Sequence, residues 1–421
     1  MKIALFGNVA NNFYRLGKAL NDIPGYEPVL LLSENEELVN LPTHDDPSLE
    51  GHVPDWVKFN DKFHLKEMFF HHRGPLLNEL KRADVVILSS MNVIASLFLR
   101  KQRVLFFATG GDLTVFPFWR RQARFIIEQR EAVSLRTLVS LARAFPLSFL
   151  MKAAIRSCDY IVVNPFLPFS LAVRKLKIPV RNQMDVYLPV AIDTDNFYLR
   201  ERADLKLDEN SLALFEQFEF KILAPSRLLT NDHPDYIESG QYKQNDLMLD
   251  VMVSLLKSYP TLSVGLFFID RGKEDRGETL KMKNRIQDLQ LSDKVVWLKP
   301  KNGSAFNRAE LIDFYCMSNL VVDEFGVGWF GSVSLEALSC SRPVLCYVDE
   351  IVMKKLYPWH PFISSLDVEE IAQRVHDLLT SPEKAQALGE KGRFWIETFH
   401  SSKAISQRCL EITNLIFTAT P

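Results

Sequence analysis

Short runs of apolar, often β-branched residues recur along this chain of 421 residues, and each is followed by a stretch with helical periodicity. Runs this uniformly apolar are typical of strands covered on both faces, as in a parallel sheet flanked by crossover helices. The predicted strands are Ile3–Phe6, Val29–Leu32, Val85–Leu88, Val104–Ala108, Ile161–Val163, Val186–Leu188, Lys221–Ala224, Val264–Ile269, Val295–Leu298, Leu320–Asp323 and Val344–Tyr347. The predicted helices between them include Asn11–Asn21, Pro168–Leu176, Asp246–Tyr259, Arg308–Met317 and Val368–Leu379. This alternation occurs in two series, so it predicts an α/β protein with two Rossmann-like domains.

The boundary between the two series is expected where the chain becomes charged and loses its periodicity, near Phe197–Phe218. A chain of this length exceeds what one hydrophobic core usually organises. We therefore expect an N-terminal domain at residues 1–198, a linker at 199–218 and a C-terminal domain at 219–400. A last helix within 402–421 could pack back on the first domain.

Composition limits the partners and the cellular location that we expect for this protein. The formal charge of −2 gives no overall attraction to nucleic acid, and none is expected as a partner. The cysteines are odd in number and lack C-x-x-C spacing, which favours buried free thiols in a reducing compartment. They are Cys158, Cys316, Cys340, Cys346 and Cys409. The first apolar run is too short for a signal peptide, and Val85–Leu99 is too short to span a bilayer. A cytoplasmic protein is expected, with the inner face of the membrane as a second location.

A glycine-rich loop follows the predicted strand that ends near Asp323. Gly326, Gly328 and Gly331 lie in this loop, and a helix is predicted to begin at about Ser332. The free N–H groups and the positive dipole end of a helix start favour a phosphate. Glu336 follows one turn later, where a carboxylate can accept hydrogen bonds from a ribose diol. The alternative is a tight turn followed by a solvated glutamate.

Two cations follow the first strand of the second series. Arg227 leaves the end of that strand, and Lys243 comes just before a predicted helix. Two cations in one cleft would stabilise the growing charge of a diphosphate leaving group. Taken alone, each is more often an ordinary surface charge.

The segment Phe220–Cys346 resembles the donor-binding half of a retaining GT-B glycosyltransferase of family 4, the "glycosyl transferases group 1". Three features match in order: the Arg227 and Lys243 pair, the glycine-rich loop before Glu336-Ala337-Leu338, and the closing strand at Arg342-Pro343-Val344. In the first half, residues 157–164 and 187–197 resemble the strand before the interdomain linker and the entry to that linker. The resemblance implies a GT-B fold, with two Rossmann-like domains whose parallel sheets face a central cleft.

The resemblance also implies roles for particular residues in donor binding. Arg227 and Lys243 would bind the donor diphosphate, together with backbone N–H groups around Gly331, Ser332 and Val333. Glu336 would hold the donor ribose.

On the first domain, the resemblance singles out two loops. The loop containing Gly7 and Asn8 would lie near the donor phosphate or the acceptor, and the loop containing Thr109 and Gly110 would face the donor sugar. Retention in this family is thought to proceed by front-face attack, with the leaving phosphate taking the acceptor proton. Asp112 is the nearest candidate for a general base.

The chain departs from the family pattern at two positions. Gly328 stands eight residues before Glu336, where the family often has a second glutamate that contacts the donor sugar. Thr109 stands where the family commonly has histidine. Sugar contacts would then come from the backbone or from Asp323 and Glu324.

Other polar motifs are interpreted as structural. Asp193-Thr194-Asp195 is a D-x-D sequence at the expected linker, and we interpret it as a turn. His71-His72 and Asp232-His233 have no third ligand at useful spacing. No metal site and no cofactor is therefore expected.

The stretch Arg100–Arg156 carries eleven lysines and arginines against three acids, interleaved with aromatic and aliphatic residues. This pattern suits docking on an anionic membrane surface, where a lipid-linked acceptor would be found. The alternative is an amphipathic helix packed on the sheet, and Pro146 is expected to interrupt any long membrane helix.

Together these features predict a retaining, metal-independent glycosyltransferase. It would move a sugar from a UDP- or GDP-sugar to a glycan, lipid-linked or other hydroxyl acceptor, in cell-surface polysaccharide or glycolipid synthesis. A sugar-nucleotide epimerase or hydrolase, and a binding protein that has lost activity, are the alternatives.

Overall fold

The computed structural model describes residues 1–65, 67, 74–128, 134–163, 165–179, 187–271, 276–300 and 306–418; at 276 and 413–418 it describes the backbone alone. The chain divides into two compact units. Unit 1 comprises Met1–Ala191 and Ser402–Pro421, and unit 2 comprises Ile192–Ser401.

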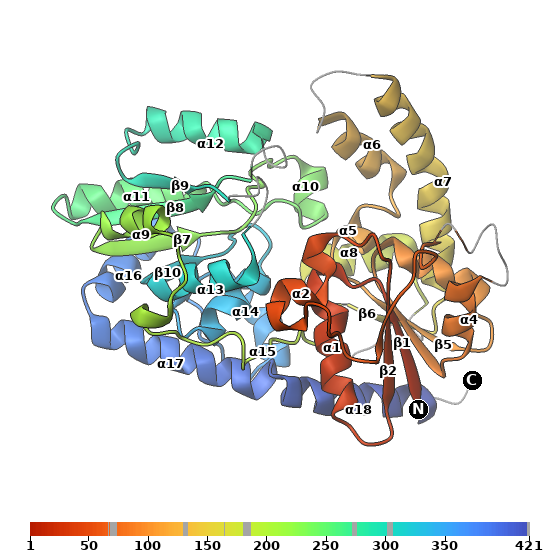
Figure 1. Cartoon of the computed structure of the whole chain (residues 1–421). Helices are drawn as coiled ribbons and strands as arrows, with labels where there is room; N and C mark the ends of the chain where they lie inside the picture. The colour runs from red at the N-terminus through yellow and green to blue at the C-terminus, as the bar shows by residue number, and fades with distance from the viewer. Residues whose placement is uncertain are drawn as a thin grey trace. The chain divides into compact units, whose positions relative to one another are not determined.

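Unit 1 is built on a parallel six-stranded sheet in the order β3-β2-β1-β4-β5-β6 (Figure 1). The strands are β1 Lys2–Phe6, β2 Glu27–Leu32, β3 Val57–Phe59, β4 Val85–Leu88, β5 Arg103–Phe107 and β6 Tyr160–Val162. The α-helices are α1 Asn12–Asn21, α2 Pro42–Asp45, α4 Pro75–Lys81, α5 Gly111–Thr114, α6 Trp119–Glu128, α7 Leu135–Ser157, α8 Leu167–Leu176 and α18 Ser402–Thr418. Shorter 3-10 helices are η1 Val9–Asn11, η2 Leu38–Asn40 and η3 Pro47–Leu49, and a longer one is η4 Ser90–Phe98. The strands are almost wholly buried, as their apolar composition predicts.

The last helix, α18, belongs to unit 1 although the whole of unit 2 separates it in sequence from the rest of that unit. Ser406 donates to the carbonyl oxygen of Ala19 in α1 at 2.8 Å. Arg408 donates to the carbonyl oxygen of Tyr187 at 3.1 Å. Ile405 and Ile412 are buried in the same core as strands β1 and β2.

Unit 2 is built on a parallel five-stranded sheet in the order β11-β10-β7-β8-β9 (Figure 1). The strands are β7 Phe220–Ala224, β8 Val264–Ile269, β9 Val295–Leu298, β10 Leu320–Val322 and β11 Val344–Leu345. The α-helices are α9 Glu209–Glu216, α10 Pro234–Glu238, α11 Leu247–Ser258, α12 Arg276–Asp288, α13 Arg308–Met317, α14 Ser332–Ser339, α15 Glu350–Leu356, α16 Val368–Leu379 and α17 Pro382–Phe399, and η6 Arg202–Asp204 is a 3-10 helix. In both sheets the order reverses beside the first strand, β1 or β7. In parallel sheets the ligand site lies beyond the carboxyl ends of the strands at such a point.

The prediction of a separate linker at 199–218 is wrong, because this segment packs on unit 2. Arg200 forms an ion pair of 2.6 Å with the buried Asp313, whose other oxygen accepts the N–H of Lys206 at 2.8 Å. Helix α9 forms in this stretch, and the Phe215 ring stacks on Phe267 at 4.2 Å. Unit 2 therefore begins at Ile192, earlier than residue 219.

Three further expectations from the sequence differ from the structure. The edge strand β3 was not expected, because it is three residues long with Lys58 at its centre. The expected strand Val186–Leu188 does not appear at residues 187 and 188, and residue 186 lies outside the described residues. Helix α7 continues through Pro146, where an interruption was expected. All five cysteines are buried free thiols, which confirms that expectation.

Candidate functional site

The two predicted cations of unit 2 lie on loops that are joined at the carboxyl end of β7. The N–H of Lys243 donates to the carbonyl oxygen of Leu229 at 2.7 Å. Asn245 accepts the N–H of Leu229 at 3.1 Å and donates to the carbonyl oxygen of Asp323 at 3.3 Å. These bonds bring the loop after β7, the loop before α11 and the end of β10 together.

Lys243 forms an ion pair with Glu324, the second residue after β10. The side chains are 22% and 7% exposed. Burial lowers the pKa of Lys243, but the nearby carboxylates of Glu324 and Asp323 raise it by more. The pKa of Lys243 is therefore higher than that of an ordinary lysine. Burial raises the pKa of Glu324, and Lys243 opposes that effect. Lys243 is therefore fully charged at neutral pH.

Arg227 lies close enough to this pair for its charge to act on both partners. It lowers the pKa of Lys243 and that of Glu324. The Arg227 side chain is exposed, and its Nη2 donates to Oε1 of Gln241 at 3.4 Å. The structure thus brings together the two cations that the sequence predicts, and the Glu324 carboxylate is near both positive charges.

The glycine-rich loop is held against Lys243 by its backbone. The N–H groups of Phe325 and Gly326 donate to the carbonyl oxygen of Lys243 at 2.9 and 3.1 Å. A Cβ atom at Gly326 would lie 2.3 Å from the carbonyl oxygen of Tyr242, so no larger residue fits without moving the backbone. Gly328 has a φ of 74°, which favours glycine.

Asp323 fixes the start of helix α14. Its carboxylate accepts the hydroxyl of Ser226 at 2.5 Å, the N–H of Gly331 at 3.0 Å, and the hydroxyl of Ser334 at 2.7 Å. The Gly331 N–H that was predicted to bind phosphate is therefore used inside the protein. The N–H groups of Ser332 and Val333 belong to the first turn of α14, where a helix offers no intrahelical acceptor.

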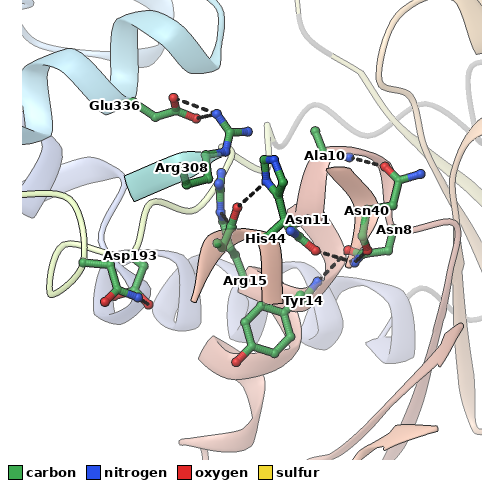
Figure 2. Close-up of polar contacts among 12 residues, drawn as sticks. Asn8, Ala10, Asn11, Tyr14, Arg15, Asn40, His44, Asp193, Arg308 and Glu336 are labelled. Carbon is green, nitrogen blue, oxygen red and sulfur yellow. Dashed lines mark hydrogen bonds and ion pairs between the residues drawn. The ribbon is translucent and has the colours of Figure 1, made fainter. Parts of the chain in front are cut away.

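Glu336 is fully buried, whereas the predicted ribose contact needs accessible oxygens. Its two carboxylate oxygens lie 2.7 and 2.9 Å from Nη1 of Arg308, at the start of α13 (Figure 2). The hydroxyl of Tyr315 donates to it at 3.0 Å. Burial and the adjacent Glu336 carboxylate raise the pKa of Tyr315. The ribose contact stays a prediction, and it requires Arg308 to release the carboxylate.

In unit 1, Gly7 and Asn8 shape the loop after β1. Gly7 has a φ of 110°, and a Cβ atom there would lie 2.5 Å from the carbonyl oxygen of Ser89. The buried Asn8 side chain donates to Asn11 Oδ1 at 2.8 Å and to the carbonyl oxygen of Asn40 at 2.7 Å (Figure 2). It also accepts the N–H of Tyr14 at 2.8 Å. The Asn8 side chain therefore holds this loop in place.

Asp112, the candidate general base, is buried and holds the loop after β5. Its oxygens accept N–H groups of Gly110 at 2.8 Å, Leu113 at 2.9 Å, Ser90 at 3.0 Å and Thr109 at 3.1 Å, and the Thr109 hydroxyl at 3.0 Å. Burial raises the pKa of Asp112, and the hydrogen bonds act in the opposite direction. The Asp112 carboxylate is thus occupied by hydrogen bonds within unit 1, and its role as a general base stays a prediction.

We expect the substitution Asp112→Asn to lower the free energy of unfolding of unit 1 by about 2–3 kcal/mol. Each carboxylate oxygen faces N–H donors, so either orientation of the new amide places its NH2 group against one of them. Denaturant unfolding followed by circular dichroism measures the change. Asp159→Asn is the control, because its half-exposed carboxylate accepts the N–H of Val104 through one oxygen, which an amide can replace. Its other oxygen makes only a half-exposed ion pair with Arg103 at 3.6 Å, whose loss should cost little. Equal stability of Asp112→Asn and wild type would contradict the assignment.

The pH dependence of the free energy of unfolding follows from the direction in which the pKa of Asp112 is shifted. Because the pKa of Asp112 is higher in the folded than in the unfolded chain, its ionisation costs stability as the pH rises through the folded value. The asparagine variant should lack that component of the pH dependence.

The D-x-D sequence and the histidine motifs were interpreted as structural, and the structure describes most of these residues. Asp193 accepts the N–H of Asp195 at 3.2 Å, and its carbonyl oxygen accepts that of Phe197 at 2.9 Å, which confirms a turn. His233 accepts the N–H of Asp235 at 3.1 Å and caps α10. His71 and His72 lie outside the described residues. Among the described residues, no three histidine, cysteine or acidic side chains are grouped to hold a metal ion.

Part of what the structure brings together was not predicted from the sequence. Glu324 was expected as a substitute sugar contact and not as the partner of Lys243, and neither Arg308 nor Tyr315 was expected as a site residue. The available signal for Glu324 was its place just after a predicted strand, where ligands of parallel sheets bind. Gly7, Asn8, Thr109, Gly110 and Asp112 all lie in unit 1.

Residues 239–395 match the family model described as "Glycosyl transferases group 1", which confirms the family resemblance for the part of the chain that holds Lys243, Glu324 and Glu336. No match was found among curated protein sequences.

Solved structures similar to this chain include HepE from Anabaena in complex with UDP and glucose, with a TM-score of 0.61 and 15% identity over 99% of this chain and 100% of that chain. Sucrose-phosphate synthase from Thermosynechococcus elongatus has a TM-score of 0.56 and 14% identity over 100% of both chains. The trehalose-6-phosphate synthase OtsA has a TM-score of 0.58 and 12% identity, also over 100% of both chains. These similarities confirm the GT-B fold, with two Rossmann-like units.

Proposed function

We propose that this chain, which carries a glycosyl transferases group 1 domain in unit 2, transfers a sugar from a nucleoside-diphosphate sugar to a hydroxyl acceptor. The observation that carries the proposal is the cluster of Arg227, Lys243 and the first turn of α14 at the carboxyl ends of β7 and β10. Positive charge and helix N–H groups in one place are the chemistry that binds a diphosphate. UDP is the proposed nucleotide, since HepE, which has the same fold, was solved with UDP-glucose.

The same groups supply the catalytic effect. In the transfer, the bond between the anomeric carbon and the donor phosphate breaks, and the diphosphate takes the bonding electrons. Lys243, Arg227 and the N–H groups of Ser332 and Val333 would stabilise that charge as it develops. We propose retention of anomeric configuration with the leaving phosphate as the proton acceptor, because Asp112 is committed to its own loop.

The ribose contact of Glu336 is part of the proposal, with one condition. The carboxylate can accept ribose hydroxyls only after Arg308 turns away from it, since Glu336 is fully buried in the pair. The proposed acceptor is a glycan or a lipid-linked sugar, in the synthesis of a surface polysaccharide or glycolipid.

Incubation with radiolabelled UDP- and GDP-sugars, with and without a membrane extract, tests the proposed activity. We expect label from one UDP-sugar to enter a lipid or polysaccharide product. Isomerised or free sugar would indicate an epimerase or hydrolase. Binding of the donor without turnover would indicate a binding protein, and either outcome would contradict the proposal.

Metal independence has its own test in the same assay. Because the proposed site stabilises the diphosphate with protein cations, the rate should stay within about twofold of its value when EDTA replaces Mg²⁺. A loss of activity in EDTA that Mg²⁺ restores would contradict this part of the proposal.

A further inference from the structure

Helix α7 of unit 1 exposes an apolar face where a surface helix normally carries polar residues. Its large exposed apolar side chains recur three, four or seven residues apart, which places them on one face. They are Leu135 (77% exposed), Leu138 (54%), Phe145 (51%) and Phe149 (58%). Ala142 and Pro146 are also exposed on this stripe. Pro146 therefore lies on the side of α7 that faces away from the rest of unit 1.

The opposite face of α7 packs inside unit 1. Thr137, Ala144, Ser148, Met151 and Ile155 are buried there. Ser148 accepts the side-chain amide of Gln122 from α6 at 2.9 Å. Of the helices in the described ranges, α7 alone is long and apolar enough to cross a membrane. Its packed face makes it an integral part of unit 1, with the apolar stripe at the surface.

Helix α6 extends the apolar surface. Trp119, which is 43% exposed, lies edge to face against Phe145 at 6.1 Å, and Phe145 packs on Phe149 at 5.0 Å. Ile127 at the other end of α6 is 48% exposed. Figure 1 shows α6 and α7 side by side. We call Trp119, Leu135, Leu138, Phe145 and Phe149 the α6–α7 patch.

Basic residues border the patch. Arg136 and Arg143, seven residues apart, are exposed on one flank of α7, and the Lys152 ammonium lies 5.9 Å from the Phe149 ring. Arg120 lies 5.7 Å from the Trp119 ring. Within α6 and α7, Glu128 is the single acidic residue. An apolar stripe between cationic flanks is complementary to a surface of acyl chains below negative headgroups.

We propose that the α6–α7 patch docks this protein on a bilayer that contains anionic lipids. Phe145, Phe149 and Trp119 would enter the headgroup boundary, while Arg136, Arg143 and Lys152 contact lipid phosphates. The charge argues against a second copy of the chain as the occupant, because two such patches would bring like charges together. The proposal does not depend on the identity of the donor sugar.

Vesicle co-sedimentation of the full chain tests the proposal. We expect strong binding to vesicles of phosphatidylcholine with 30 mol% phosphatidylglycerol, weak binding to phosphatidylcholine alone, and loss of binding at high salt. The double variant Phe145→Ser/Phe149→Ser should bind at least about tenfold more weakly. The double variant Arg136→Gln/Arg143→Gln should lose about 25-fold, or about fivefold per charge.

Helix α17 offers matched controls. Phe394 is 60% exposed and stacks beside Trp359, much as Phe145 lies beside Trp119, so Phe394→Ser should leave binding unchanged. Lys384 and Lys391 are exposed and seven residues apart, so Lys384→Gln/Lys391→Gln matches the arginine variant in charge and spacing. Circular dichroism and thermal unfolding check that each variant is folded.

Three results would overturn the proposal. The first is equal binding to neutral and anionic vesicles, or no binding to either. The second is equal loss in the patch variants and the α17 controls. The third is a wild-type dimer in analytical ultracentrifugation that Phe145→Ser/Phe149→Ser converts to a monomer, which would make the patch an interface between copies.

Discussion

Replacing Lys243 by alanine is expected to lower the rate of sugar transfer by about 10²–10³-fold, the usual cost of removing one charge-stabilising donor from an active site. Lys243 is the half-buried cation of the proposed diphosphate site, and its removal also leaves Glu324 buried without its ion pair. The pKa of Glu324, which burial already raises, should then rise further. Transfer measured at saturating donor gives the effect on kcat, and a donor titration gives the effect on KM.

Controls for this variant separate catalysis from folding. Lys221→Ala removes a lysine near the amino end of the same strand, β7, and should keep wild-type activity. The double variant Lys243→Ala/Glu324→Gln removes the unpaired charge, so it should recover stability without recovering transfer. Wild-type activity in Lys243→Ala, or recovery of activity in the double variant, would remove Lys243 from the site.

The raised pKa of Lys243 also predicts the alkaline side of the pH profile. A lysine whose folded pKa lies above its unfolded value stabilises the fold below the unfolded value and loses that contribution as the pH rises through the folded one. Lys243 should therefore cause no loss of activity between pH 7 and about pH 10.

Arg308→Ala is expected to lower the free energy of unfolding of unit 2 by about 3–5 kcal/mol, because it leaves the Glu336 carboxylate buried without its cation. Replacing both partners with apolar residues of similar size, as in Arg308→Met/Glu336→Leu, should recover most of that loss. Denaturant unfolding of each variant measures the difference.

The matched control is an arginine in an exposed ion pair. Arg374 pairs with Glu370 on helix α16, with side chains 49% and 45% exposed, and Arg374→Ala should cost less than about 1 kcal/mol. Equal effects of Arg308→Ala and Arg374→Ala would show that the buried pair does not hold α13 and α14 together.

The two variants also bear on the ribose contact. If Glu336 binds the donor ribose, Arg308→Met/Glu336→Leu should keep the fold and lose donor affinity. Unchanged affinity in that stable variant would restrict Glu336 to a structural role.

Most strands of the two sheets could be predicted from the sequence because they are apolar runs with few exposed residues. Val85–Leu88, Val264–Ile269 and Val295–Leu298 have the predicted boundaries, since continuous apolar runs between turns leave few alternatives. Strand β3 could not be predicted, because a three-residue edge strand with a central lysine carries no such pattern.

The roles of the polar residues were harder to predict, because they depend on partners distant in sequence. Glu336 pairs with a residue 28 positions away, and nothing local distinguishes it from an accessible helix carboxylate. Asp112 follows a strand, as a catalytic residue would, but Ser90 at the start of η4 also donates to it. By contrast, Arg227 and Lys243 could be predicted, because both lie between the carboxyl end of β7 and helix α11, on loops at one edge of the sheet.

A crystal structure of the complex with UDP would show whether a diphosphate binds at Lys243, Arg227 and the start of α14. We expect phosphate oxygens about 3 Å from Nζ of Lys243 and from the N–H groups of Ser332 and Val333. UDP bound with its phosphates away from Lys243 and the start of α14 would contradict this expectation.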